Sequence, residues 1–307
     1  MEGIVFKSTG SWYSVVTTEN TSYKCRIRGK IRTKGLKTTN PVAVGDRVKI
    51  FIEDSDQALG VIEELLPRTN YIIRQAVKKS SQAHIIAANI DLAMLIVTEV
   101  YPKTSLGFID RFLVTAESFR IPQALIFNKT DLLNTEQQTN QTLKIDLYKN
   151  LGINCLETSA IDNQGIEALK GMLEGKKTLI SGHSGVGKST LINHLAPHLN
   201  QKTGDISEFA KKGVHTTTFA EMFDLNHNTF VIDTPGIKEL GLIDIEVYEL
   251  SDYFPEMRAL SQECKFNNCV HLDEPGCEIK DALEDGRVSE SRYLSYLSMI
   301  EGTDNRR

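Results

Sequence analysis

Short runs in which hydrophobic and polar residues alternate fill the first part of the chain. They span residues 3–8, 12–18, 22–34, 45–53 and 58–65, and Gly, Asn, Asp and Ser residues separate them. A period of two is typical of half-buried β-strands in a small barrel or sandwich. About five strands in about 70 residues favour an OB-fold, with an SH3-like barrel as the alternative. We therefore expect an all-β OB-fold barrel over residues 1–70.

The pattern changes after Pro67. Apolar strand candidates lie at residues 91–99, 123–128, 153–158, 177–181, 219–225 and 229–233. Helical patterns alternate with them at residues 106–120, 140–150, 165–173 and 188–196. This alternation predicts a parallel, doubly wound sheet with helices on both faces. We assign residues 71–242 to this α/β domain and residues 243–307 to a mostly helical, acidic domain.

Length and composition exclude several classes of protein. The chain has 307 residues, of which 40% are hydrophobic and 24% charged, as in soluble globular proteins. No apolar run approaches the roughly 20 residues of a membrane helix. The first ten residues lack the basic and apolar regions of a signal peptide. We expect a cytoplasmic protein, monomeric and without a membrane partner.

Charge is unevenly spread along the chain. The net charge is −5, but residues 1–70 hold 11 Lys and Arg against 8 Asp and Glu. Six basic residues occupy every second position of one strand candidate: Lys24, Arg26, Arg28, Lys30, Arg32 and Lys34. In a strand they share one face, where a solvated charged surface is the alternative to a binding site. Because like charges repel and Trp12, Tyr13 and Tyr23 lie nearby as stacking groups, the pattern favours contact with RNA.

A phosphate-binding loop follows the strand candidate at residues 177–181. The sequence GHSGVGKST matches G-x-x-x-x-G-K-[ST] through Gly182, Gly187, Lys188 and Ser189. Backbone N–H groups of such a loop surround the phosphates, the Lys neutralises β- and γ-oxygens, and the Ser hydroxyl binds Mg²⁺. The other expected nucleotide contacts in this stretch are His183, Ser184, Gly185, Val186 and Thr190.

Two further motifs indicate recognition of guanine. The sequence NKTD, residues Asn128, Lys129, Thr130 and Asp131, closes an apolar strand candidate. The Asp131 carboxylate can accept two hydrogen bonds from the N1–H and N2–H₂ edge of guanine, which adenine lacks. Asn128 is expected at the N7 and O6 side, with the Lys129 stem on the ring. Without the other motifs, a turn or a helix N-cap would be the favoured interpretation of NKTD.

The sequence TSA follows the next strand candidate. Its residues are Thr158, Ser159 and Ala160, and a backbone N–H there is expected to reach guanine O6. Together with NKTD and the phosphate-binding loop, it predicts a GTP- and GDP-binding site.

The residues for hydrolysis are less sharply defined. The sequence DTPG, from Asp233 to Gly236, follows a strand candidate, so Asp233 is expected to hold Mg²⁺ and Gly236 to contact the γ-phosphate. Ile237 follows, where other GTPases use a Gln to orient water. In the preceding stretch, Thr216 or Thr217 can bind Mg²⁺, and His215 is either the residue that positions water or an ordinary loop residue.

The order of these motifs is unusual. NKTD and TSA precede the phosphate-binding loop, and DTPG comes last. Joining the ends of an ordinary GTPase domain and cutting it after DTPG would give this order while every motif kept its place in the sheet. The sequence therefore predicts a circularly permuted GTPase domain in which DTPG leads directly into the C-terminal domain.

A cluster of cysteines in the C-terminal domain predicts a metal site. Cys264, Cys269, His271 and Cys277 are spaced as C-x₄-C-x-H-x₅-C. Three thiolates and one imidazole complete a tetrahedral Zn²⁺ site without an open position, which is a structural arrangement. We therefore expect one structural zinc ion rather than disulfides or free thiols.

These motifs together resemble the circularly permuted small ribosomal subunit biogenesis GTPases of the RsgA/YjeQ type. The resemblance covers nearly the whole chain, as OB-fold, permuted GTPase domain and zinc domain in that order. It implies a factor that binds the 30S subunit and its rRNA late in maturation, hydrolyses GTP faster on the subunit, and then dissociates. It also implies that His215 is the catalytic residue.

Two alternatives stay open on the sequence. Ile237 fits a GTP-dependent RNA-binding switch with little turnover. A permuted GTPase that acts on the large subunit or another RNA is the second alternative, although the order of the domains argues against it.

Overall fold

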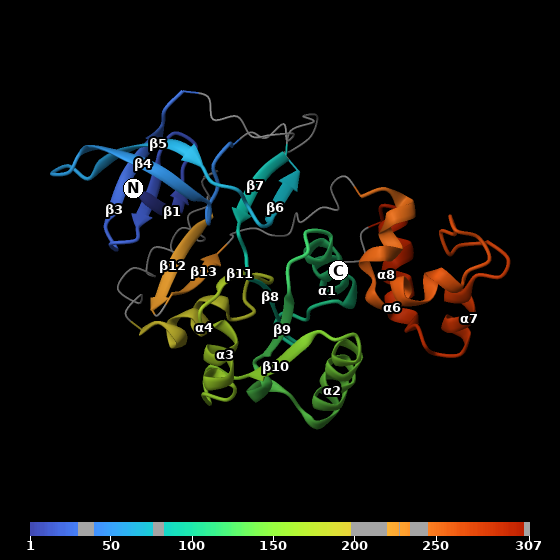
Figure 1. The fold of residues 1–307 in the computed structure, drawn as a ribbon. Coiled ribbons are helices and arrows are strands. Elements are labelled where there is room, and N and C mark those ends of the chain that lie inside the picture. Colours follow the sequence, from blue (N-terminus) through green and yellow to red (C-terminus); the bar gives the residue numbers. More distant parts are fainter. Residues whose placement is uncertain (30–39, 76–82, 198–219, 227, 234–244, 304–307) are drawn as a thin grey trace.

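The computed structural model describes residues 1–29, 40–75, 83–197, 220–226, 228–233 and 245–303. Figure 1 shows a strand-rich part at the N-terminus, a sheet flanked by helices in the middle, and a group of short helices at the C-terminal end. Among the described residues, no helix is both long and apolar enough to cross a bilayer.

Five N-terminal strands form the expected barrel. Their bounds are β1 (Glu2–Ser8), β2 (Tyr13–Thr17), β3 (Ser22–Ile27), β4 (Arg47–Asp54) and β5 (Leu59–Leu65). They pair in the order β1-β2-β3-β5-β4, and a β1–β4 pairing closes the ring. Strands β3 and β5 are parallel, whereas the other pairs are antiparallel. The inward residues of the strands fill the barrel with a core of their own, which confirms the OB-like fold.

The central sheet contains the six strands expected from the sequence. They are β8 (Leu92–Val97), β9 (Gln123–Asn128), β10 (Asn154–Thr158), β11 (Lys177–Ser181), β12 (Glu221–Asn226) and β13 (Thr229–Asp233). Their order is β10-β9-β8-β11-β13-β12. Five are parallel, but β12 pairs with β13 in the antiparallel direction, so the prediction of an all-parallel sheet is wrong for β12.

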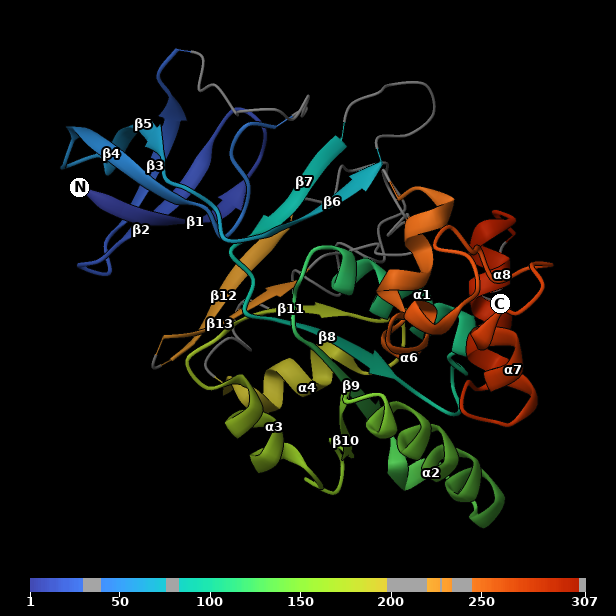
Figure 2. The same ribbon diagram turned by 45° about the vertical axis from the view of Figure 1, so that its right-hand side comes forward.

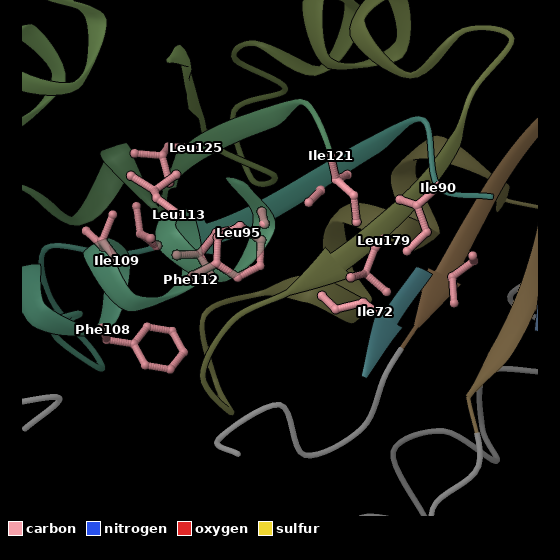
Figure 3. Packing of buried hydrophobic residues seen from close by; sticks show 14 of the residues in the cluster. Ile72, Ile90, Leu95, Phe108, Ile109, Phe112, Leu113, Ile121, Leu125 and Leu179 are labelled. Atoms are coloured by element: carbon pink, nitrogen blue, oxygen red, sulfur yellow. The ribbon is translucent and has the colours of Figure 1, made fainter. Parts of the chain in front are cut away.

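Helices cover both faces of this sheet, as the sequence predicts. On one face lie α1 (Leu106–Ser118) and α2 (Thr135–Asn150), and on the other α3 (Ile166–Leu173) and α4 (Lys188–Leu195). Successive residues of β8 face opposite sides of the sheet. Leu95 packs in the core with α1, and Met94 packs in the core with α3 and α4. Figure 3 shows Phe112 and Leu113 of α1 in the first of these two cores.

A hairpin that the sequence did not predict joins the barrel to the sheet. Its strands are β6 (Tyr71–Gln75) and β7 (Ala83–Ala88), which pair antiparallel. Ile72 and Ala87 of the hairpin belong to the same core as α1. A second link is strand β1, which pairs with β12 at Lys7 and Glu221 and extends the sheet into the barrel. The barrel and the central sheet are therefore one continuous packing unit.

The C-terminal helical unit, residues 245–303, packs against α1. It contains η4 (Val247–Tyr253), α6 (Pro255–Leu260), η5 (Ser261–Glu263), α7 (Glu278–Glu284) and α8 (Glu290–Ile300). Figures 1 and 2 both show α1 between the sheet and this unit. Val114 of α1 is fully buried in the apolar core of the unit. Helix α1 thus contributes to two hydrophobic cores.

A buried charge network fixes this contact. Asp110 of α1 is fully buried and accepts hydrogen bonds from Arg292 and Ser295 of α8 and from Tyr148 of α2. Arg292, 2% exposed, also binds Glu256 of α6 with an Nε–Oε1 distance of 2.7 Å. Removing one member of such a group leaves an uncompensated buried charge, so loss of any member is expected to weaken the docking of the unit.

Candidate nucleotide and metal sites

The parallel strands bring the nucleotide motifs to one edge of the sheet. NKTD begins at the end of β9, TSA at the end of β10, the phosphate-binding loop follows β11, and Asp233 ends β13. The carboxyl ends of parallel strands share one edge, which is where open α/β sheets bind ligands. Motifs that are out of their usual order along the chain are therefore neighbours in space.

The phosphate-binding loop has the backbone that its glycines allow. Gly182, Gly185 and Gly187 have φ values of 147°, 87° and 96°, in the region that residues with a Cβ rarely adopt. A Cβ on Gly182 would lie 2.5 Å from the Ile96 carbonyl oxygen. Helix α4 begins at Lys188, directly after the loop. The helix N-terminus and the loop N–H groups together form an arrangement suited to phosphate.

Lys188 is held in place by the loop itself. Its Nζ donates to the carbonyl oxygens of Gly182 and His183 at 2.6 and 2.8 Å. An ammonium group has three N–H donors, so one remains for a phosphate oxygen. Burial lowers the pKa of Lys188, and the negative charge of Asp233 acts against that shift. The lysine is thus oriented by carbonyl groups of the loop itself.

Asn128 connects the three nucleotide motifs. Its Nδ2 donates to the Val186 carbonyl of the phosphate-binding loop at 2.8 Å, and its Oδ1 accepts from Thr158 Oγ1 at 2.9 Å. The side chain is buried, 2% exposed. The sequence assigns Asn128 to the N7 and O6 side of guanine. Both ends of its amide bind protein here, and the second N–H of Nδ2 remains as a donor for the base. It therefore ties the base-reading and phosphate-binding segments together.

Lys129 and Thr130 of NKTD are held by further hydrogen bonds. Lys129 has φ 65° and donates from Nζ to the Tyr101 carbonyl at 2.5 Å. Thr130 Oγ1 donates to Thr158 O and lies 3.1 Å from Gln164 Oε1. Asp131, which the sequence assigns to guanine recognition, is exposed.

The TSA segment lies at the same edge of the sheet, and its residues are buried. Ser159 is fully buried, and its N–H donates to the Gln164 carbonyl. Ala160 follows, 8% exposed. Tyr101 and Gln164, which support Lys129 and Thr130, were not predicted, because nothing in their own sequence context marks them.

Gly187→Ala is expected to weaken nucleotide binding more than Gly185→Ala. Both glycines have positive φ, so both substitutions carry a similar backbone cost of about 1 kcal/mol or more. Only at Gly187 would the new Cβ also lie 2.4 Å from Asn128 Nδ2, whereas at Gly185 the nearest atom is Pro102 Cδ at 3.6 Å. The dissociation constants of both variants for a fluorescent GDP analogue give the comparison. Equal losses would contradict the role of Asn128.

The catalytic prediction lies mainly outside the described residues. Asp233 is described, and it ends β13, which pairs with β11 directly before the phosphate-binding loop. Its carboxylate is close enough to Lys188 to affect the pKa of that amine. His215, Thr216, Thr217 and Gly236 lie outside the described ranges.

The predicted metal ligands come together in the C-terminal helical unit. The ligand atoms of Cys264, Cys269, His271 and Cys277 all lie within 4.8 Å of one another, and all four residues are buried. Ligands about 2.3 Å from a tetrahedral zinc ion lie close to 4 Å apart, so the cluster has the size of a zinc site. His271 Nδ1 faces the thiols, at 3.7 Å from Cys264 Sγ and 3.5 Å from Cys277 Sγ. The cluster is compatible with one zinc ion bound through Nδ1.

The loops around the cluster are fixed by further hydrogen bonds. The Tyr293 and Tyr296 hydroxyls of α8 donate to the His271 and Val270 carbonyls at 2.6 and 2.7 Å. The Glu274 carboxylate accepts from the N–H groups of Val270 and Leu272. The ligand loop is thus anchored to α8, the helix that also contacts α1.

The basic strand differs from its prediction. Lys24, Arg26 and Arg28 share an exposed face, as expected, while Lys30, Arg32 and Lys34 lie outside the described residues. However, Arg26 binds Glu53 and Arg28 binds Glu63, so acidic residues of other strands partly neutralise this face.

The aromatic residues near this face are also placed differently. Tyr13 and Tyr23 are 2% and 9% exposed in the barrel core, so their prediction as stacking groups is wrong. Trp12, 39% exposed, is at the surface, with Lys24 Nζ 4.6 Å from its ring centroid.

Fold and site together define a GTPase that binds phosphate through a Gly-rich loop and whose motifs follow a circularly permuted order. The sequence model described as RsgA GTPase matches residues 65–243, and the model of the RsgA N-terminal domain matches residues 2–62. The chain belongs to the RsgA GTPase family, whose members are hydrolases that act on GTP.

Relatives match over nearly the whole chain. A protein of Flavobacterium psychrophilum named small ribosomal subunit biogenesis GTPase RsgA is 51% identical over 305 residues, covering 99% of this chain and 94% of that protein. The RsgA 2 protein of Bacteroides thetaiotaomicron is 50% identical over 301 residues, covering 98% of this chain and 96% of its own.

Two solved structures share the fold. The crystal structure of YjeQ from Thermotoga maritima has 35% identity and a TM-score of 0.77, with 100% of this chain and 99% of that chain covered. YloQ, described as a circularly permuted GTPase, has 29% identity and a TM-score of 0.75, with coverage of 100% and 96%. The permuted order predicted from the motifs is thereby confirmed.

Proposed function

We propose that this protein binds the 30S ribosomal subunit, assists its late maturation, hydrolyses GTP to GDP and phosphate when stimulated by the subunit, and then dissociates. The observation that carries the proposal is the 51% identity, over 99% of the chain, to a relative named for small ribosomal subunit biogenesis. The shared edge of the sheet, with its phosphate-binding loop and guanine-reading segment, supports the GTP-dependent part.

The residues of the nucleotide site have four roles: they bind the phosphates, the base and Mg²⁺, and they position the attacking water. Gly182–Thr190 surround the phosphates, Lys188 neutralises β- and γ-oxygens, and Asn128–Asp131 with Ser159 and Ala160 bind the base. Mg²⁺ is bound by Ser189, Asp233 and Thr216 or Thr217, and Gly236 contacts the γ-phosphate. His215 positions the attacking water, since Ile237 stands where other GTPases have a Gln.

The C-terminal cluster holds a structural Zn²⁺ ion through Cys264, Cys269, His271 and Cys277. Four protein ligands leave no open position, so the ion stabilises the loops rather than taking part in hydrolysis. Tyr293 and Tyr296 support this role, because their bonds to the ligand loop would hold it in the metal-binding conformation.

The barrel contacts rRNA through the surface around Trp12 and Lys24, which offers a base-stacking ring beside a cation. Three domains, residues 1–70, 71–242 and 243–307, carry RNA binding, GTP hydrolysis and zinc binding. We propose that the protein acts in the cytoplasm as a monomer.

The rate of GTP hydrolysis tests this function. We expect slow turnover by the protein alone, a clear increase on addition of 30S subunits, and no comparable increase with 50S subunits. Turnover that 30S subunits leave unchanged would contradict the proposal and favour a GTP-dependent RNA-binding switch with little turnover, which Ile237 also fits.

His215→Ala is expected to lower the 30S-stimulated turnover by about 10²- to 10⁴-fold, the range typical of a positioned acid–base group. GTP affinity should remain within about 2-fold, because the residue acts on the attacking water and not on binding. His194→Ala is the control. His194 lies in the last turn of α4, and the variant should have the same stimulated turnover and GTP affinity as the original protein. Full stimulated turnover in His215→Ala would rule out the catalytic role.

A further inference from the structure

Helix α1 contacts the phosphate-binding loop through an aromatic stack. The Phe108 ring of α1 lies against the His183 ring of the loop, with centroids 3.9 Å apart and an angle of 28° between the planes. Phe108 is 6% exposed and belongs to the core between α1 and the sheet. Figure 3 shows it near the start of α1. The stack therefore links a rigid core residue to a residue of the nucleotide site.

His183 also helps to orient Lys188. Its backbone carbonyl accepts a hydrogen bond from Lys188 Nζ at 2.8 Å. The Phe108 ring restrains the side chain of His183, and through it the backbone that presents this carbonyl. A loop that is already in its binding conformation loses less conformational entropy when it binds a ligand.

The other side of α1 is held by the C-terminal helical unit. Asp110 lies two residues after Phe108, about 200° further around an α-helix, and so faces nearly the opposite way. There it accepts hydrogen bonds from Arg292 and Ser295, with an Arg292 Nη1–Asp110 Oδ1 distance of 2.7 Å. One turn of α1 thus contacts the phosphate-binding loop on one side and the C-terminal unit on the other.

We propose that Phe108 is a positioning residue of the nucleotide site, and that α1 transmits the docking of the C-terminal helical unit to the phosphate-binding loop. The inference concerns nucleotide affinity and does not depend on the ribosomal partner. The permuted chain connects DTPG to the C-terminal unit by sequence, and this route connects the unit to the loop by packing.

A double-mutant cycle tests the first part. Phe108→Leu keeps an apolar side chain without a ring, and His183→Ala removes the partner. Each is expected to raise the dissociation constant for a fluorescent GDP analogue by about 2- to 12-fold, the value of an aromatic pair. The double variant should bind no more weakly than the weaker single variant. His183→Phe, which can restore a stack, should bind more tightly than His183→Ala.

If Phe108 acted only through general core packing, the dissociation constants would follow a different pattern. The losses from the two single variants would then multiply in the double variant, and His183→Phe would give no recovery. Either result overturns the positioning role. Melting temperatures of all variants, measured in parallel, show whether each protein remains folded at the temperature of the binding assay.

Substitutions on α8 test the second part. Ser295→Ala removes one hydrogen bond to Asp110, and Arg292→Lys replaces the planar guanidinium by a single ammonium. We expect both to raise the GDP dissociation constant by about 2-fold or more. Arg258→Lys is the matched control, since Arg258 also joins the C-terminal unit to α1 but through an exposed pair with Glu117. Affinities of the α8 variants equal to that of Arg258→Lys would overturn the transmission through α1.

Discussion

Asp131→Asn is expected to reverse the preference of the site from guanine to xanthine nucleotides. The carboxylate accepts both N1–H and N2–H₂ of guanine, whereas an amide places its own donor against one of them. Xanthine carries a carbonyl in place of the 2-amino group and accepts from that donor. Since a site with unmatched polar groups discriminates strongly, GTP affinity should fall by about 10²- to 10⁴-fold while XTP affinity rises.

Competition between each nucleotide and a fluorescent GDP analogue gives these affinities for the original protein, and a fluorescent xanthine analogue gives them for the variant. Asp146→Asn, an exposed aspartate on α2, is the matched control and should leave both affinities unchanged. If Asp131→Asn still preferred GTP over XTP, then Asp131 would not read the base.

Cys277→Ser is expected to abolish zinc binding and to destabilise the C-terminal helical unit. Metal binding to a site of this kind contributes about 10–16 kcal/mol to folding, and losing one thiolate removes a large part of it. We expect a loss of about 4 kcal/mol or more in the stability of the unit. Metal analysis of the purified protein and limited proteolysis of residues 245–303 measure the two effects.

Cys155→Ser provides the control for this experiment. Cys155 is a half-buried thiol on β10 and is not one of the clustered residues, so the variant should retain about one zinc ion per chain. If Cys277→Ser retained zinc at the same level, the ion would not be held by the proposed ligands.

The ligand loop that carries the Cys and His cluster is also linked to the nucleotide site in this structure. Tyr293 and Tyr296 of α8 hold the ligand loop, and Arg292 of the same helix binds Asp110 of α1. Disruption of the ligand loop should therefore weaken the docking of α8, and through α1 affect the phosphate-binding loop.

The local chemistry of the sites could be predicted from the sequence because each motif is short and each follows a strand. The glycines of the phosphate-binding loop, the NKTD segment and the spaced Cys and His residues carry their own conformational or ligand requirements. Their meeting in space followed from one rule, that parallel strands end at one edge. That is why the permuted order did not hide the site.

The direction of β12 could not be predicted in the same way. A short apolar run shows the same pattern in either direction, and only its pairing with β13 decides. The β6–β7 hairpin was missed because its strands show little alternation and pack on the core through residues such as Ile72 and Ala87. Asp110 and Arg292 are 182 residues apart, so their contact has no local signal.

Tyr13 and Tyr23 were predicted to be stacking groups, although the alternation in the sequence already indicated that they face the barrel core. In a strand, the alternation that turns Lys24 and Arg26 outward turns Tyr23 inward. Tyr13 lies opposite Cys25 in the β2–β3 pair and shares its inward face. Trp12 precedes β2 and lies at the surface, so of the three aromatic residues it is the one that is accessible for stacking.

Sedimentation with isolated ribosomal particles shows whether the protein binds the 30S subunit in a GTP-dependent way. The protein is incubated with 30S, 50S or 70S particles in the presence of a non-hydrolysable GTP analogue or GDP, and the pelleted fraction is measured. We expect association with 30S subunits that is stronger with the GTP analogue than with GDP. Association with 50S subunits alone would contradict it.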